Sequence, residues 1–406
     1  MEPKIRFKGF EGGWKDTIWG NHIVSTHTGT NLLGEVSNKG IPLLKMGNIQ
    51  RGFFDLDKME YLAANQNPPV NCIANYGDFF YNTRNTLELV GKGATWMKID
   101  GIYAFNSNIA ICKLDGIDTF FFNYLYNTLR SIKQVQARAK GTTSVAAVYM
   151  RDLKSIELAL PHISEQQAIA SYFTTLDSQI SASTSRLASL KQMKAASLQA
   201  MFPQEGETVP KIRFKGFEGE WKKVKLSEIL TERHENSTIT DSLPQLSFTI
   251  ADGVIRPEDR KSNKRDFLIK DIDNKRYLVT KVGDIIYNPA NVVYGAIHRN
   301  SLMNGVVSPI YKIFTTMQDS NFIECAVRRP SFITKLAMCT EGTVTKLKTL
   351  KPEAFLNMEV CITPSLEEQK LIGNYFTSLD RQISLQSQRL EKLKQIKSAC
   401  LDKMFV

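Results

Sequence analysis

The chain has 406 residues, enough for two or three domains that each bury a core of their own. Its 42% hydrophobic and 23% charged residues exclude an intrinsically disordered chain, and no window holds the roughly 18–20 apolar residues of a membrane span. The net charge of +11 favours a polyanionic partner such as nucleic acid, with a merely basic soluble protein as the alternative.

Cysteine and histidine are scattered. The six cysteines form no Cys-x-x-Cys pair, so we expect small apolar core residues in a reducing cytoplasm rather than disulfides or zinc ligands. His22 and His27 are the closest histidine pair, but their spacing does not suit two ligands on one helical turn. The sequence therefore predicts no metal site, and the charged segment 1–14 lacks the apolar stretch of a signal peptide.

A repeated segment opens each half of the chain. Residues 3–14 read PKIRFKGFEGGW and residues 210–221 read PKIRFKGFEGEW, which differ only at Gly13 and Glu220. Such self-similarity indicates one structural unit of about 200 residues written twice. We interpret the copies as two related domains acting on different targets; a structural duplication without functional meaning is the alternative.

Residues 15–160 contain short apolar runs separated by turn residues. The runs 77–81, 109–112 and 156–160 predict strands, and the stretch 120–136 predicts a short helix, as in a mixed α+β domain. Polar and basic loop positions are candidates for DNA contacts, because Arg, Lys and Asn bind base edges or neutralise phosphates. For each one alone, a solvated surface side chain is the alternative. These candidates are Arg84, Asn85, Lys92, Arg138, Lys140, Thr142 and Thr143.

The segment 165–202 predicts a long helix. Pro161 precedes the pattern Ser164-Glu-Gln-Gln167, which is typical of a capping box with Ser164 as the cap, and no Gly or Pro follows until the end of the segment. Apolar residues recur with spacings of 3 and 4, as in a coiled-coil seam. A helix of this length spans about 57 Å, and one narrow apolar stripe cannot stabilise it without a partner.

A second copy of this helix, residues 368–405, aligns without gaps and is identical at 21 of 38 positions. We expect the two copies to pair as an antiparallel coiled coil with a globular domain at each end; two helices that each pack only on their own domain are the alternative. Ser183 and Gln386, like Lys194 and Lys397, are polar interruptions that we expect to fix the register. The predicted seam residues are Leu176, Ile180, Leu187, Leu190, Leu379, Ile383, Leu390 and Leu393.

Residues 222–363 form a second variable segment that shares only short matches with the first, such as Gly77-Asp78 with Gly283-Asp284. The runs 277–280 and 285–287 predict strands, and 321–338 predicts a short helix. The candidates for DNA contacts here are Arg256, Lys261, Lys264, Arg265, Arg276, Asn291, Arg299, Lys346 and Lys348.

Motifs of catalysis are missing from the sequence. Asn67-Pro68-Pro69 precedes Val70, where an adenine methyltransferase needs an aromatic ring to stack on the flipped base, so we interpret it as a turn. No Gly-x-x-x-x-Gly-Lys-Ser/Thr loop for a nucleotide is present, and the five histidines allow no assignment of a catalytic triad. The sequence predicts no catalytic residue and no cofactor of this chain's own.

The order of these parts resembles the specificity subunits of type I restriction–modification systems. The resemblance rests on the opening P-K-I-R-F-x-G-F-x-x-x-W at 3–14 and 210–221, and on the exits Gly141-Thr-Thr-Ser and Gly342-Thr-Val. The E-Q-x-x-I-x-x-Y-F-T-x-L-D-x-Q-I start of each helix completes it. The resemblance covers the whole chain, and the order of the motifs is more specific than any one of them.

This resemblance implies an α+β fold with two mixed α/β target recognition domains, separated by two long helices in an antiparallel coiled coil with a pseudo-twofold repeat. The expected parts are recognition domains at 1–160 and 206–363 and spacer helices at 161–205 and 364–406. Each domain would read one half of a split site in double-stranded DNA, and the helices would set the spacing and dock two methyltransferase subunits.

Restriction subunits would join this assembly, which we expect in the cytoplasm and not at a membrane. S-adenosylmethionine, ATP and Mg²⁺ would be bound by the partner subunits and not by this chain. Two alternatives are a scaffold that has lost DNA binding and a recognition module detached from a single-chain restriction–methylation enzyme.

Overall fold

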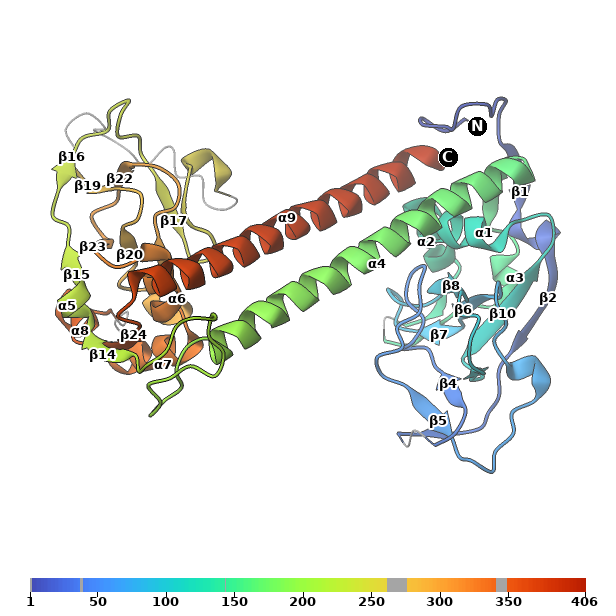
Figure 1. The fold of residues 1–406 in the computed structure, drawn as a ribbon. Coiled ribbons are helices and arrows are strands. Elements are labelled where there is room, and N and C mark those ends of the chain that lie inside the picture. The colour runs from blue at the N-terminus through green and yellow to red at the C-terminus, as the bar shows by residue number, and fades with distance from the viewer. Residues whose placement is uncertain (1, 37–38, 143, 261–275, 341–348) are drawn as a thin grey trace. The chain divides into compact units, whose positions relative to one another are not determined.

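The computed structural model describes residues 2–36, 39–142, 144–260, 276–340 and 349–406, which form two compact units (Figure 1). Unit 1 comprises residues 1–184 and 388–406, and unit 2 comprises residues 185–387. The two long helices, α4 (Ile163–Ala200) and α9 (Leu366–Met404), therefore each contribute one half to each unit. The predicted boundaries treat the helices as separate segments, whereas the compact units divide them.

Unit 1 is built around a four-stranded antiparallel sheet with the order β2-β10-β6-β8. Its strands are β2 (Ile23–Thr28), β10 (Ile109–Leu114), β6 (Phe79–Asn82) and β8 (Gly93–Thr95). A second sheet has the order β3-β5-β4-β9, with β3 (Gly34–Glu35), β5 (Glu60–Leu62), β4 (Pro42–Leu44) and β9 (Ala104–Phe105). The strands predicted at 77–81 and 109–112 correspond to β6 and β10. The strand predicted at 156–160 corresponds to β13 (Glu157–Leu160), which pairs with β1 (Lys15–Ile18).

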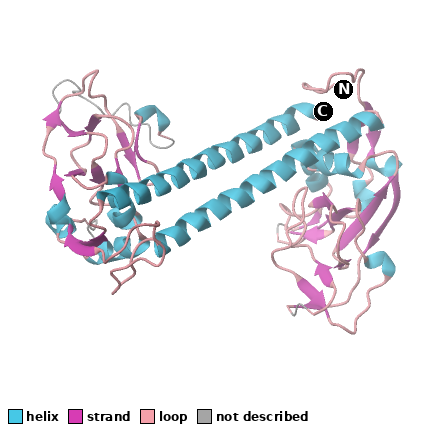
Figure 2. Ribbon diagram, in the orientation of Figure 1, coloured by secondary structure: helices cyan, strands magenta, loops and turns pink. Residues whose placement is uncertain are grey.

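Unit 1 also has a small sheet with the order β11-β12-β7, formed by β11 (Lys140–Gly141), β12 (Ala146–Ala147) and β7 (Arg84–Asn85). Its helical elements, shown in cyan in Figure 2, are α1 (Thr119–Tyr126), α2 (Leu129–Ala137), α3 (Met150–Leu153), η1 (Trp19–His22) and η2 (Val70–Cys72). All four residues of β6 are buried, which a sheet covered on both faces requires.

The single helix predicted at 120–136 is a pair, α1 and α2. The break falls at Thr128, whose hydroxyl accepts a hydrogen bond from the Ser131 amide and so caps a new helix. Helix α1 buries aromatic side chains in the core of unit 1, where Trp19 packs its ring against Phe122 with centroids 5.2 Å apart, and α2 buries Val135 in the same core. The prediction missed the capping residue because Thr128 lies within an otherwise helical pattern.

Unit 2 repeats the main sheet with the order β15-β23-β20-β21, and β14 (Lys222–Lys225) pairs with β24 (Glu359–Ile362) as β1 does with β13. The main strands are β15 (Leu230–Glu232), β23 (Lys312–Thr316), β20 (Ile285–Tyr287) and β21 (Ile297–Arg299). The additional strands differ from those of unit 1: β16 (Asn236–Ser237), β19 (Tyr277–Thr280) and β22 (Gly305–Val307) form one sheet, and β17 (Ser247–Thr249) pairs with β18 (Gly253–Ile255). The strands predicted at 277–280 and 285–287 are present.

The helix predicted at 321–338 is also a pair, α6 (Ser320–Val327) and α7 (Pro330–Met338), and Pro330 at the first turn of α7 marks the break. The remaining helical elements of unit 2 are α5 (Leu226–Ile229), α8 (Pro352–Leu356), η3 (Pro257–Asp259) and η5 (Val292–Tyr294). Within the described part of the chain, no helix is long and apolar enough to cross a membrane.

The start of α4 differs from the predicted capping box. Ser164 lies inside the helix, and the ring nitrogen Nδ1 of His162 lies 3.4 Å from the Ser164 amide. In α9 the Ser365 hydroxyl accepts a hydrogen bond from the Glu368 amide at 3.2 Å and so caps the helix. The two copies are offset by 203 residues, so Ser365 corresponds to His162 rather than to Ser164, and the prediction of Ser164 as the cap is wrong.

The six cysteines are free thiols. Cys72 and Cys112 are buried as predicted, but Cys339 is exposed after the end of α7, so the expectation of a core position is wrong for this residue. The remaining three are half-buried.

The two long helices pack against each other within each unit. Tyr172 and Asp177 of α4 contact Cys400 and Lys397 of α9, so the helices run antiparallel in unit 1. In unit 2, Lys194 and Ser197 of α4 contact Asp380 and Tyr375 of α9, with the same antiparallel direction. Of the predicted seam residues, Leu176, Leu190, Leu379 and Leu390 are buried, and Ile180, Leu187, Ile383 and Leu393 are half-buried.

Each core is closed by a phenylalanine from the end of a long helix. In unit 2, Phe202 is fully buried against Trp221, Phe322 and Phe376, with ring centroids 5.3–6.3 Å away. In unit 1, Phe405 takes the same place against Trp14, Phe121 and Phe173, with centroids 5.5–6.1 Å away. The backbone repeats the arrangement, because Ile5 and Ile212 donate to the carbonyls of Lys403 and Ala200.

We expect these two phenylalanines to contribute unequally to stability. Phe202→Ala should lower the free energy of unfolding by about 3–5 kcal/mol, because it leaves a cavity in a closed core. Phe405→Ala should lower it by less, since Phe405 is only half-buried and its removal leaves a smaller cavity. Urea unfolding followed by tryptophan fluorescence measures both losses, and Phe53→Ala, at a residue that is 59% exposed, is the control. A loss for Phe405→Ala equal to or above that for Phe202→Ala would contradict this assignment.

Candidate nucleic-acid interface

The duplicated opening segment of each half is held by an arginine. In unit 1, Arg6 donates from Nε and from a terminal nitrogen to the two oxygens of Glu165, each at 2.7 Å, and also to the carbonyls of Glu11 and Gly12. Glu165 is 1% exposed and belongs to the first turn of α4. The hydrogen bonds to Glu165 raise the pKa of Arg6 above its ordinary value. This bidentate pair joins the opening segment to the start of the long helix.

Unit 2 contains the same arrangement. Arg213 donates to the two oxygens of Glu368 at 2.6 and 2.8 Å and to the Gly219 carbonyl at 2.6 Å. Thr363 adds a hydroxyl hydrogen bond to the buried Glu368 carboxylate. Neither member of this pair was predicted from the sequence, although the arginine and the glutamate are identical in the two copies, and that identity is the signal that could have identified them.

An ion pair joins the two helices in each unit. In unit 1, Lys397 lies 2.5 Å from Asp177, and the Tyr124 hydroxyl donates to the same carboxylate at 2.9 Å. Burial and the Asp177 charge raise the pKa of Tyr124. In unit 2, Lys194 lies 2.5 Å from Asp380. The predicted polar interruptions at Lys194 and Lys397 therefore have carboxylate partners on the facing helix.

Four of the predicted DNA-contacting residues of unit 1 lie close together. Arg84 and Asn85 form β7, Lys140 belongs to β11, and Thr142 lies in the turn between β11 and β12. Thr143 lies outside the described residues.

The other two candidates of unit 1 have partners inside the domain. Lys92 is 8% exposed and donates to the side-chain oxygen of Gln50 at 2.9 Å, and burial lowers its pKa. Arg138 donates to the Ser155 hydroxyl and to the carbonyls of Gln134 and Ser155.

The candidates of unit 2 belong to separate elements. Arg256 precedes η3 and lies 3.9 Å from Glu258, whereas Arg276 is exposed just before β19. Asn291 is half-buried just before η5, and the Arg299 side chain is only 14% exposed beside Glu324. Lys261, Lys264, Arg265, Lys346 and Lys348 lie outside the described residues.

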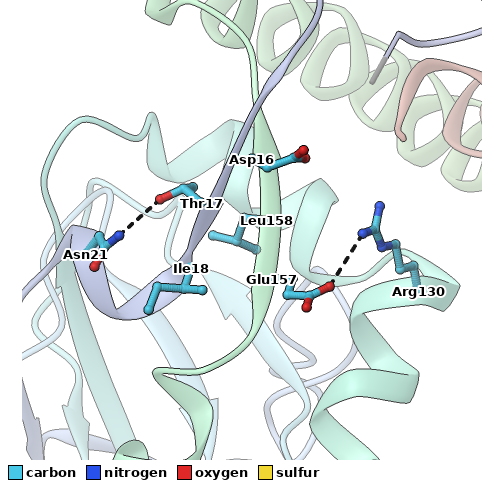
Figure 3. Close-up of a pocket in the computed structure, with 7 residues that line it drawn as sticks. All are labelled: Asp16, Thr17, Ile18, Asn21, Arg130, Glu157 and Leu158. Atoms are coloured by element: carbon cyan, nitrogen blue, oxygen red, sulfur yellow. Dashed lines mark hydrogen bonds and ion pairs between the residues drawn. The ribbon is translucent and has the colours of Figure 1, made fainter.

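A shallow cavity of unit 1 lies along the β1–β13 pair (Figure 3). Asn21 donates to Thr17 across a 3.4 Å separation, and Arg130 lies 3.9 Å from Glu157 on its rim. The cavity contains none of the predicted DNA-contacting residues. Among the residues that the structure describes, no group of three or more His, Cys, Asp or Glu side chains is placed to hold a metal ion.

Comparison with known proteins assigns the chain to a family. Residues 34–192 and 218–395 each match the type I restriction modification DNA specificity domain. The chain belongs to the type I restriction–modification DNA specificity family. Each matched segment contains most of one globular domain and most of one long helix, so the internal repeat is two copies of this family's domain.

Individual relatives agree with this assignment. A type I restriction enzyme specificity subunit, MjaX, of Methanocaldococcus jannaschii is 20% identical over 89% of this chain and 86% of its own length. The crystal structure of the S subunit of a type I restriction–modification system from M. genitalium matches with a TM-score of 0.64 at 14% identity, over 100% of this chain and 99% of the other. At this identity the structural likeness shows the fold.

The Lys194–Asp380 pair allows a test of the antiparallel register. Lys194→Asp should destabilise unit 2, because it places two carboxylates together, and the double variant Lys194→Asp/Asp380→Lys should recover stability. We expect a coupling of about 0.3–1 kcal/mol, as for a partly exposed ion pair. Urea unfolding measures the coupling, and Lys392→Ala at an exposed position of α9 is the control. The loss of unfolding free energy in the double variant should be smaller than the sum of the losses in the two single variants. A loss equal to that sum would contradict the pairing.

Proposed function

We propose that the chain is the DNA sequence-specificity subunit of a type I restriction–modification complex. Each globular domain reads one half of a bipartite site in double-stranded DNA, and the paired helices set the distance between the halves. The observation that carries this proposal is the match of both halves of the chain to a DNA specificity domain.

The division of each unit into constant and variable parts supports two domains that recognise different DNA sequences. Arg6 and Arg213 hold their glutamates with the same geometry, and both main sheets have the same strand arrangement. The additional sheets differ between the units, and so do the loops that carry the candidate contacts. A framework that stays constant while its surface loops diverge is expected where loops read different targets. A scaffold without DNA binding has no need for this divergence.

The net charge supports a nucleic-acid partner. A surplus of +11 attracts a polyanion over a long range and gains free energy by releasing counterions from phosphates. Base-edge contacts by arginine, asparagine and hydroxyl side chains then provide sequence discrimination. This chain contributes binding and orientation, and the chemical steps belong to its partners.

The proposed partners are two methyltransferase subunits and, for cleavage, restriction subunits. S-adenosylmethionine would be bound by the methyltransferase subunits, and ATP and Mg²⁺ by the subunits that cleave. Exposed apolar side chains on the long helices, among them Leu385 at 56% and Met193 at 44%, are candidates for contacts with such subunits. We place the complex in the cytoplasm.

Exchange of one domain tests the proposal. Residues 15–160 are replaced by the matching segment of a relative with a different target, and the chain is produced with its methyltransferase subunits in cells lacking other adenine methyltransferases. Sequencing that detects methylated adenine should show one half of the site changed and the other half retained, because the domains bind DNA separately. A parallel exchange of residues 222–363 should change the opposite half.

Two controls define the result. Cells that contain the methyltransferase subunits without this chain should show no site-specific methylation. A change of both half-sites by a single exchange, or methylation at the same sites without the chain, would contradict the proposal.

A further inference from the structure

The small sheet β11-β12-β7 of unit 1 brings two cations onto one face. Its register places Lys140 opposite Ala147, and Ala147 opposite Arg84. Directly opposed residues of neighbouring strands project to the same face of a sheet, so Arg84 and Lys140 lie on either side of Ala147. Two strand spacings separate their backbones by about 9–10 Å. Ala146, in the adjacent register, is 1% exposed, so the opposite face is turned toward the core.

Backbone hydrogen bonds extend the pairing of this sheet and connect it to the segment before β10. The Thr83 amide donates to the Asn108 carbonyl, and the Val148 amide donates to the Thr83 carbonyl, each at 2.9 Å. Gly141 has a φ of +127°, and a Cβ atom there would lie 2.3 Å from the Val145 carbonyl oxygen. The turn after β11 therefore requires glycine, and the backbone that carries both cations is held in place by the domain itself.

The two cations differ in their surroundings. Lys140 lies 3.3 Å from Asp152, which also lies 3.6 Å from Arg151. Arg84 is exposed, and among the described residues no side chain forms an ion pair or hydrogen bond with its guanidinium group. Among the described residues, the face thus presents one cation without a side-chain partner and one that lies beside a carboxylate.

Small and hydroxyl-bearing residues complete the surface. Ala147 lies between the two cations, and the exposed Thr142 and Ser144 hydroxyls lie 3.2 Å apart at the turn. Without a bulky side chain between the cations, a smooth polyanionic surface can approach both. Their backbones lie about 9–10 Å apart, more than the 3.4 Å axial rise between successive charges of one DNA strand, so each cation can meet a phosphate of its own.

We infer that this face of the β11-β12-β7 sheet contacts the phosphate backbone of duplex DNA, with Arg84 and Lys140 each neutralising a phosphate. The inference rests on the proposed function and assigns these residues to positioning of the first domain rather than to reading of bases. Phosphate contacts fix the register of a protein on DNA without selecting its sequence.

The test compares variants of the full chain assembled with its methyltransferase subunits. Binding to a duplex that contains the mapped site, and to a random duplex of equal length, is measured at several salt concentrations. The slope of log K against log salt concentration is negative. For Arg84→Ala its magnitude should decrease by about 0.9 for both duplexes, the value for one phosphate contact. The preference for the mapped site and the methylated sequence should stay unchanged.

Matched variants sharpen the result. Arg84→Lys should keep the slope because it keeps the charge. Lys140→Ala should reduce the slope by less than Arg84→Ala, since Lys140 is already paired with Asp152. Lys133→Ala, which removes an exposed cation from α2 of the same unit, should leave the slope unchanged.

Three outcomes would overturn the inference: an unchanged slope for Arg84→Ala, an altered first half-site in its methylated sequence, or an equal fall in slope for Lys133→Ala. These outcomes leave the proposed function intact as long as the unchanged chain prefers its mapped site over the random duplex. Loss of that preference in the unchanged chain would remove the proposed function and the inference together.

Discussion

The antiparallel pairing of α4 with α9 is the constraint on which the rest of the molecule depends. Neither globular core is complete without it, because each contains the start of one helix and the end of the other. Phe405 closes the core of unit 1 and Phe202 closes that of unit 2, each from the far end of a long helix. The bidentate arginine–glutamate pairs then attach the opening segments to the helix starts. The folding of each domain is therefore coupled to the pairing of α4 with α9.

This coupling explains how the domains can diverge in sequence. Several residues that contact the helices are the same in both units, such as Arg6 and Arg213, whereas the outer strands differ. Unit 1 adds the sheets β3-β5-β4-β9 and β11-β12-β7 to its main sheet, and unit 2 adds β16-β19-β22 and the β17–β18 hairpin. A change of target thus requires new outer loops but leaves the framework intact. The two copies of the family's domain in this chain show the result of such divergence.

Much of the framework could be predicted from sequence, because it depends on strong periodic patterns. The heptad spacing and the internal repeat predicted both long helices to within two residues at each end, and the buried apolar runs predicted the strands. The predictions at two helix breaks and at the start of α4 were wrong, because single residues outweigh the periodic pattern there. A threonine cap and a proline each divided an apparently continuous helix, and His162 replaced Ser164 at the start of α4. These outcomes depend on single side chains that a pattern over ten residues does not resolve.

The candidate interface was less predictable than the fold, since a cation's role depends on neighbours that are distant in sequence. Lys92 and Arg299 are residue types that commonly contact DNA, but their side chains are enclosed by the domain. Arg84 and Lys140 lie 56 residues apart and share a face only because β12 pairs with both of their strands. The partners of the Arg6–Glu165 pair are 159 residues apart, so no local sequence pattern predicts their contact.

Insertion of one heptad into each long helix tests the central claim most directly. Seven residues keep the apolar seam in phase and lengthen each helix by roughly 10 Å, at 1.5 Å per residue. If the paired helices set the distance between two separate readers, mapping of methylated adenines should show both half-sites unchanged. The unread spacer between them should be longer by about three base pairs, at 3.4 Å each. A spacer of unchanged length in an assembled, active complex would contradict the account.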